Sequence, residues 1–220
     1  MNRQSTAARR RFLQATGGAL LLRPQTVFGS QANSNVELGL VGCGGRGNWI
    51  APLFSEYAGA RVVAVADVIQ NRLDATRQKL QVDSSRAYWG PDAHRELAQS
   101  KLDAVVIETP PYFHPAHAAA AVDAGKHVFC AKPVAVDVPG SKGFLANGQR
   151  AREKGLSFWV DFQSRARAVF QEAVVRMQRG DIGKIAMAQV FYYANRPWVD
   201  RSTPAMEPGL KPGLSALSTG

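Results

Sequence analysis

A glycine-rich loop near the start of the chain has the residue types and spacing that hold a diphosphate. Gly42, Gly44 and Gly47 form a G-x-G-x-x-G pattern between an apolar run and a segment typical of a helix. The first glycine permits a tight turn, the second lets phosphate oxygens approach the backbone, and the third lets helix and strand pack closely. The backbone amides of Gly45 and Arg46 would then face the phosphates from the positive end of the helix.

A carboxylate ends the next apolar run, 20 positions after the last of these glycines. At that place Asp67 can accept hydrogen bonds from both ribose hydroxyls of NAD, and its charge would repel the 2′-phosphate of NADP. Arg72 could offset that repulsion, so the sequence favours NAD and leaves NADP open. The alternative, a tight turn that holds no ligand, is disfavoured because strand, helix and acid occur together.

Three further groups of polar residues follow later apolar runs. They are ETPPYFHP (108–115), CAKP (130–133) and DFQSR (161–165). If the runs are parallel strands, their carboxyl ends meet at the edge of the sheet where ligands bind. Lys132, fixed by Pro133, would point into that cleft, hydrogen-bond a substrate hydroxyl and stabilise developing alkoxide charge. The alternative for this residue is a solvated loop lysine. Lys132 and Pro133 are also expected among the cofactor-binding residues.

The first of these groups contributes further candidates. The Thr109–Pro110 turn is expected to line the nicotinamide side of the site, and His114, at the start of the next helix, is included among the cofactor-binding residues. His117 is expected at the surface. Because the two histidines lack a third ligand, no metal site is predicted. Two roles are open to Glu108: it either faces the cofactor or pairs with a base such as Arg46.

Alternating strands and helices must position these residues. The apolar runs predict strands at 36–42, 60–67, 86–90, 102–109, 126–132 and 156–162. The segments between them predict helices at 49–58, 70–81, 91–100, 114–125 and 140–155. This alternation indicates an α/β fold with a doubly wound parallel sheet covered on both faces. Pro52 is expected in the first turn of its helix, where proline is tolerated.

The net charge of +10 is concentrated near the N-terminus. Residues 1–32 contain five arginines and no acidic residue, which is half of the excess. Arg9 and Arg10, followed by a mildly apolar segment, resemble a twin-arginine signal with cleavage after Ala32, so we expect export to the periplasm. The alternative is a disordered basic tail. No basic stripe elsewhere indicates nucleic-acid binding, and no apolar run is long enough to span a membrane.

The pattern changes after residue 163. A long amphipathic helix is expected over 164–184, closed by Gly180, followed by a strand over 185–198 with one face exposed. Cys43 and Cys130 are expected to be free thiols, because a chain folded in the cytoplasm before export need not pair them. We divide the chain into a signal peptide (1–32), a Rossmann domain (35–155), the start of a truncated second α/β domain (156–200) and an irregular tail (201–220).

Taken together, the glycine loop, Asp67, the segment 103–137 and the GDIGKI turn resemble the Gfo/Idh/MocA oxidoreductases, the group of glucose–fructose oxidoreductase and inositol dehydrogenase. The resemblance covers about 36–193. It implies bound NAD(H) or NADP(H), hydride transfer at a hydroxyl-bearing carbon of a sugar, cyclitol or related polyol, and oligomers formed through the second domain. The family usually has Glu-Lys-Pro after the fifth strand, whereas this chain has Ala131 before Lys132 and Pro133.

The resemblance also implies a catalytic histidine on a downstream segment, and 194–220 does not contain a match for it. Three functions therefore stay open. The first is an NAD(P)-dependent oxidoreductase of a sugar or polyol, in which Lys132 orients the reacting hydroxyl. The second is a glycosidase of the same fold, which uses NAD for transient oxidation and elimination. The third is a nucleotide-binding remnant without catalysis.

Overall fold

Six parallel strands form one sheet in the computed structural model, which describes residues 36–191. The strands are β1 (Val36–Val41), β2 (Ala60–Asp67), β3 (Ala87–Trp89), β4 (Ala104–Ile107), β5 (His127–Ala131) and β6 (Phe158–Asp161). Their order across the sheet is β3-β2-β1-β4-β5-β6, which confirms the doubly wound parallel sheet. Since the order reverses between β1 and β4, ligands of this architecture are expected outside the carboxyl ends of those strands.

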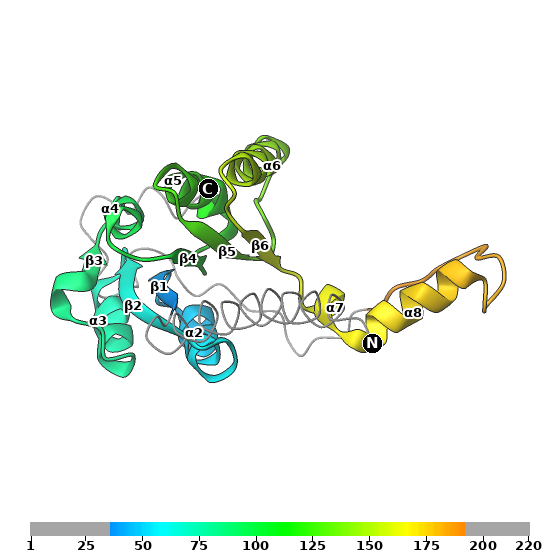
Figure 1. Cartoon of the computed structure of the whole chain (residues 1–220), viewed down its shortest axis with the longest axis horizontal. Coiled ribbons are helices and arrows are strands. Elements are labelled where there is room, and N and C mark those ends of the chain that lie inside the picture. Colours follow the sequence, from blue (N-terminus) through cyan, green and yellow to red (C-terminus); the bar gives the residue numbers. More distant parts are fainter. Residues whose placement is uncertain (1–35, 192–220) are drawn as a thin grey trace, which may run out of the picture.

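Helices cover both faces of the sheet (Figure 1). They are α2 (Gly45–Ala58), α3 (Gln70–Lys79), α4 (Ala93–Gln99), α5 (His114–Asp123) and α6 (Val138–Glu153). Short 3-10 turns, η1 (Ser84–Arg86) and η2 (Pro111–Phe113), precede β3 and α5. The helices α2 and α3 lie on one face and α4, α5 and α6 on the other, which is the arrangement expected of right-handed βαβ crossovers in a doubly wound sheet.

Alternate residues of the central strands enter two separate cores. Leu40 and Val65 pack with Ile50 of α2 on one face. Ile107 packs with Leu97 of α4 on the opposite face. Because both faces of the sheet are covered, the strands are apolar almost throughout. Cys43 and Cys130 are buried free thiols, as expected from the sequence.

The first helix differs from its prediction. It begins at Gly45, inside the glycine motif, so Pro52 lies in the helix interior and not in the first turn. A proline there supplies no N–H for the carbonyl of the residue four positions earlier. In this chain the Lys79 ammonium donates a hydrogen bond to that carbonyl, Asn48 O, at 2.9 Å. The Lys79 side chain, from α3, thus replaces the hydrogen bond that Pro52 cannot donate.

The region after β6 also differs from its prediction. The expected long helix is divided into α7 (Gln163–Ala166) and α8 (Ala168–Arg179), because Arg167 between them has an extended backbone. Gly180 ends α8 in the left-handed conformation, as predicted. Residues 185–191 are not a strand, since the described part of the chain offers them no pairing partner. Figure 1 shows α8 projecting from the sheet, and its apolar side chains, including Val169 and Phe170, are exposed.

Several predictions lie outside the described residues. These are the signal peptide over 1–32, the tail over 201–220 and the rest of the strand predicted over 185–198. The boundaries proposed for the two domains stay predictions. Within 36–191, no helix is both long and apolar enough to cross a membrane.

Candidate dinucleotide site

Two positions of the glycine motif, one in the loop after β1 and one in the first turn of α2, can have only glycine. Gly42 has a φ of +101°, and a Cβ there would lie 2.7 Å from backbone atoms of Glu108. A Cβ on Gly47 would lie 2.0 Å from the carbonyl oxygen of Gly42. These contacts bring the start of α2 against the ends of β1 and β4, so the first and third glycines of the motif have the packing roles expected from the sequence.

Asn48 and Thr76, which the sequence did not mark as site residues, hydrogen-bond the carbonyl groups of the loop. The Asn48 amide donates to the carbonyl oxygen of Cys43 at 2.8 Å and contacts the hydroxyl of Thr76, also at 2.8 Å. That hydroxyl donates to the same carbonyl at 3.2 Å, and Thr76 is fully buried. With its carbonyl groups directed inward, the loop leaves the amides at the start of α2 for other partners. Asn48 directly follows the motif, but nothing in the sequence marks Thr76.

The outer side of the loop is open. A Cβ built on Gly45 meets no atom within 4 Å, and one built on Gly44 meets only a guanidinium nitrogen of Arg72, at 3.8 Å. No side chain caps the N-terminus of α2. The amides of its first turn have no acceptor within the helix and carry the positive end of the helix dipole. The residues present therefore fit a diphosphate group bound against the backbone.

Asp67 reaches this loop from the end of β2. Its carboxylate accepts hydrogen bonds from the backbone N–H of Cys43 at 2.7 Å and of Ile69 at 2.8 Å. Burial raises the pKa of Asp67, although these hydrogen bonds and the charge of Arg72 oppose the rise. Each carboxylate oxygen can accept a second hydrogen bond, so the acid remains able to accept ribose hydroxyls.

His114 joins the two turns at the ends of β4 and β5. Its ring is fully buried, and its two nitrogens each lie 2.7 Å from a carbonyl oxygen, one of Thr109 and the other of Pro133. The side chain therefore sets the spacing between these turns. Pro110 is exposed at the start of its turn. Direct contact of His114, Thr109 or Pro110 with a cofactor stays a prediction.

The expected surface position of His117 is wrong. Its ring contacts that of His94 with centroids 4.2 Å apart and planes tilted by 30°, and it stacks on Phe113 at 5.7 Å. Its Nδ1 lies 3.1 Å from the hydroxyl of Thr109. Burial, followed by the neighbouring histidines, lowers the pKa of His117 to about 3. The ring is therefore neutral near pH 7 and supports the Thr109 turn through packing between α4 and α5.

Lys132 stands exposed at the end of β5, directly after the buried Ala131. The peptide bond between Lys132 and Pro133 is cis. The ammonium group makes no ion pair with any residue in the described part of the chain. This position agrees with the expected approach of Lys132 to the strand-end edge, while its contact with a substrate stays a prediction.

Glu108 pairs with Arg46, which is one of the two roles that the sequence left open. The guanidinium Nε lies 3.3 Å from Glu108 Oε2, and Nη2 hydrogen-bonds Asp161 at the end of β6. The Arg46 guanidinium also lies 4.8 Å from the centre of the Trp49 ring. Burial raises the pKa of Glu108 to about 7, the charge of Arg46 opposes the rise, and the charge of Asp161 adds to it. The side chain of Arg46 therefore binds carboxylates and is not available to a phosphate. Its backbone N–H, in the first turn of α2, stays available.

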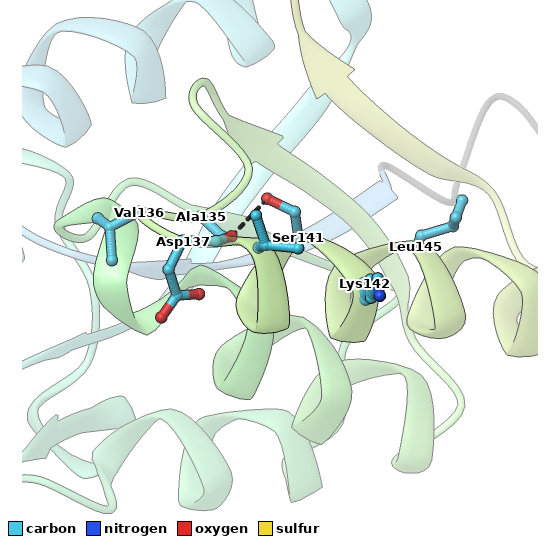
Figure 2. Close-up of a pocket in the computed structure, with 7 residues that line it drawn as sticks. Ala135, Val136, Asp137, Ser141, Lys142 and Leu145 are labelled. Carbon is cyan, nitrogen blue, oxygen red and sulfur yellow. Dashed lines mark hydrogen bonds between the residues drawn. The ribbon is translucent and has the colours of Figure 1, made fainter.

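A separate shallow groove of about 480 Å³ lies where α6 begins (Figure 2). Its lining includes Val136 and Leu145, but none of the predicted site residues. Two of its polar groups cap the helix: Asp137 accepts from the N–H of Gly140, and Ser141 donates to the carbonyl of Asp137, which leaves Lys142 as the other polar side chain of the lining. The groove therefore offers few polar groups to a ligand, and the glycine loop is the stronger candidate site.

Comparison with known families agrees with this site. Residues 36–162 match the model of the Gfo/Idh/MocA oxidoreductase family, described as an NAD-binding Rossmann fold. The chain belongs to this family. The matched residues include the glycine loop, Asp67 and the turns after β4 and β5.

The chain is similar in sequence to an inositol dehydrogenase and to a glycosyl hydrolase family protein. It is 29% identical over 150 residues to scyllo-inositol 2-dehydrogenase (NAD(+)) of Bacillus subtilis, covering 68% of this chain and 42% of that protein. A glycosyl hydrolase family 109 protein of Shewanella amazonensis is 35% identical over 111 residues, which cover 48% of this chain and 24% of the relative.

Among solved structures, the scyllo-inositol dehydrogenase of Lactobacillus casei with bound NAD(H) and scyllo-inositol is similar with a TM-score of 0.58 and 26% identity. That match covers 68% of this chain and 43% of the other. This chain therefore spans less than half the length of the relatives that it matches.

Proposed function

We propose that this protein is an NAD-dependent oxidoreductase that acts on a hydroxyl group of a cyclitol, a sugar or a related polyol. The open glycine loop carries the proposal: the space beside Gly44 and Gly45 and the amides at the start of α2 suit a diphosphate. Family membership and the similarity to inositol dehydrogenases support the substrate class.

One group of residues binds the dinucleotide, and another orients the reacting hydroxyl. Gly44, Gly45 and the backbone of Arg46 hold the diphosphate, and Asp67 accepts the ribose hydroxyls. The bound nicotinamide supplies the hydride acceptor. Lys132, exposed at the end of β5, donates a hydrogen bond to the reacting hydroxyl and stabilises negative charge on its oxygen. His114 keeps the turn that carries Lys132 in place through the carbonyl of Pro133.

Asp67 would select NAD over NADP. Its carboxylate is held against the loop by two backbone amides, where a 2′-phosphate would meet its negative charge. In Asp67→Asn that repulsion is removed, so we expect the affinity for NADPH relative to NADH to rise by about tenfold. Equilibrium titration of both reduced dinucleotides, followed by fluorescence, measures this ratio, and an unchanged ratio would refute the role of Asp67.

The decisive experiment combines binding with turnover in the full 220-residue chain. We expect NADH to bind with a measurable fluorescence change and NAD⁺ to be reduced with at least one member of a panel of cyclitols and sugars that includes scyllo-inositol. Lys132→Met should keep NADH affinity within about twofold and lower kcat/KM by about a hundredfold or more. Binding without turnover on any substrate would instead support a nucleotide-binding protein without catalysis.

The similarity to a glycosyl hydrolase family 109 protein favours a second candidate, a glycosidase that oxidises and re-reduces its substrate within one cycle. Such an enzyme would release free sugar from a glycoside while the absorbance of the nicotinamide showed no net change. Assays with chromogenic glycosides, read at both the dye and the nicotinamide wavelengths, separate this candidate from a net oxidoreductase.

We also propose that the protein is exported through the twin-arginine route to the periplasm and that it forms homo-oligomers. The arginine pair at Arg9 and Arg10 supports export. Replacing both by lysine should retain the protein in the cytoplasm, as judged by fractionation. Sedimentation of the purified protein tests the oligomeric state.

A further inference from the structure

A small cluster of charged side chains lies at the ends of β4 and β6, and none of these side chains holds the diphosphate or ribose in the proposed function, where Arg46 contributes only its backbone. Glu108 and Asp161 share the guanidinium of Arg46, which contacts Oε2 of Glu108 and Oδ2 of Asp161. The Glu108 side chain is fully buried, and its second oxygen, Oε1, has no hydrogen-bond partner in the described part of the chain. A buried acceptor without a partner costs free energy and is expected to serve a purpose.

The cluster carries one more negative than positive charge when both carboxyl groups are ionised. Arg46 and Asp161 are the charged groups that act on Glu108. On β5, Cys130 faces Glu108 as a neutral thiol, because burial and the charge of Glu108 raise its pKa. Lys132, which directly follows β5, makes no ion pair with Glu108. A bound molecule that brings one positive charge would therefore balance the cluster.

The position of the cluster limits which part of a dinucleotide can meet it. Glu108 directly follows Ile107, which pairs with Cys130, and its backbone packs against Gly42 of the loop. Asp161 pairs with Ala131, the residue before Lys132. The cluster thus extends from the glycine loop across the ends of β4 and β5 to β6, past the turn that carries Lys132. With the diphosphate at α2 and one ribose at β2, the other half of an extended dinucleotide crosses the ends of β4 and β5.

We propose that Glu108, Arg46 and Asp161 form an anionic floor for the nicotinamide half of the site, which favours the oxidised dinucleotide over the reduced one. This inference rests on the proposed function. The nicotinamide ring is positively charged in NAD⁺ and uncharged in NADH, so ionised Glu108 stabilises only the former through its charge. The site thereby discriminates redox state with side chains that do not bind the diphosphate.

The proton on Glu108 makes this discrimination dependent on pH. The pKa of about 7 leaves the carboxyl neutral in mildly acidic solution and ionised in mildly alkaline solution. Binding of a cationic ring favours the ionised form and lowers the pKa of Glu108, whereas binding of NADH does not. If the ring lowers that pKa by about one unit, the ratio of NADH to NAD⁺ dissociation constants rises by about eightfold between pH 5.5 and 8.5.

The test is an equilibrium titration of the full chain with NADH, and with NAD⁺ by competition, at pH 5.5, 7.0 and 8.5. We expect the ratio of the two dissociation constants to rise with pH in the unaltered protein and to be constant in Glu108→Gln. Asp161→Asn removes one negative charge and lets Glu108 ionise at lower pH, so it should lower the ratio at pH 8.5, where Glu108 is ionised in both proteins, and reduce the rise of the ratio with pH, without replacing the buried residue. Glu153→Gln, an exposed carboxyl-to-amide change in α6, is the matched control and should behave as the unaltered protein.

The possible outcomes separate this inference from the function on which it rests. If neither dinucleotide binds to the unaltered chain at any pH, the proposed function fails. If both bind and their ratio is independent of pH, or rises equally in Glu108→Gln, the anionic floor is refuted while the dinucleotide site stands. If Glu108→Gln does not fold, Asp161→Asn decides the result, and an unchanged ratio there overturns the inference.

Discussion

Cys43 and Asp67 are 24 residues apart in sequence, yet the backbone N–H of Cys43 donates a hydrogen bond of 2.7 Å to the Asp67 carboxylate. The second oxygen of that carboxylate accepts from the N–H of Ile69 at 2.8 Å. One acid at the end of β2 therefore fixes both its own turn and the first turn of the glycine loop. The residue expected to bind ribose also shapes the loop expected to bind diphosphate.

Asp67→Ala should lower both stability and dinucleotide affinity. The change leaves two amides without their acceptor, one of them on the buried Cys43, which costs about 1–3 kcal/mol of unfolding free energy. The loop is then less ordered, so NADH affinity should also fall by at least about tenfold. Urea denaturation and NADH titration measure the two effects. Asp74→Ala on α3 serves as the control, and equal behaviour of the two variants would contradict this role of Asp67.

The glycines of the loop should separate folding from binding. Gly47→Ala places a Cβ 2.0 Å from the carbonyl oxygen of Gly42 and should cost about 2 kcal/mol or more, seen as a lower Tm. Gly44→Ala has an ordinary backbone conformation and a nearest neighbour at 3.8 Å, so it should fold normally. Its methyl group would enter the proposed diphosphate space and weaken NADH binding by about tenfold or more.

For Gly45→Ala we expect an unchanged or slightly higher Tm, because no atom lies within 4 Å of the added methyl group and alanine favours the helix by up to about 1 kcal/mol. The prediction is tested by the order of the two Tm values, with Gly45→Ala above Gly47→Ala. Equal Tm values for Gly45→Ala and Gly47→Ala would show that the close approach of Gly47 to Gly42 is not important for folding.

Glu108 should make the protein less stable as the pH rises. Its pKa is raised from 4.5 to about 7 in the folded state, so the folded protein holds a proton that the unfolded chain has lost. Stability linked to this proton is present below pH 4.5 and is lost as the pH rises to about 7. Relative to Glu108→Gln, the unaltered protein should lose about 3 kcal/mol between pH 4.5 and 7.5. Urea denaturation across this range measures the difference, and a constant difference would contradict the raised pKa.

The sequence predicts the sheet and the loop because both depend on local patterns. Apolar runs separated by amphipathic segments suffice for parallel strands with helices on both faces, and G-x-G-x-x-G followed by Asp67 suffices for the loop. The break at Arg167 was missed, because an amphipathic pattern continues across a single extended residue without interruption.

Contacts between distant elements were not predictable in the same way. Thr76 supports the loop from α3 at an ordinary buried position, and no spacing rule connects it with Cys43. The pairing of Glu108 with Arg46 was one of two options, and only the packing of α2 against β4 selects it. The contact of Asp161 with the same guanidinium depends on how closely α2 approaches the end of β6. Sequence patterns predict the type of sheet but not such a contact.

Pro52 and Lys79 offer a test of how α3 supports α2. Pro52→Ala restores an N–H that can donate to Asn48 O, the carbonyl now satisfied by the Lys79 ammonium at 2.9 Å. An interior proline costs a helix about 3 kcal/mol, partly offset because proline restricts the unfolded chain, so we expect a gain of about 1–2 kcal/mol. Lys79→Met should destabilise the unaltered protein more than it destabilises Pro52→Ala. A double-mutant cycle measured by urea denaturation gives this coupling, and strict additivity would mean that the lysine does not compensate for the proline.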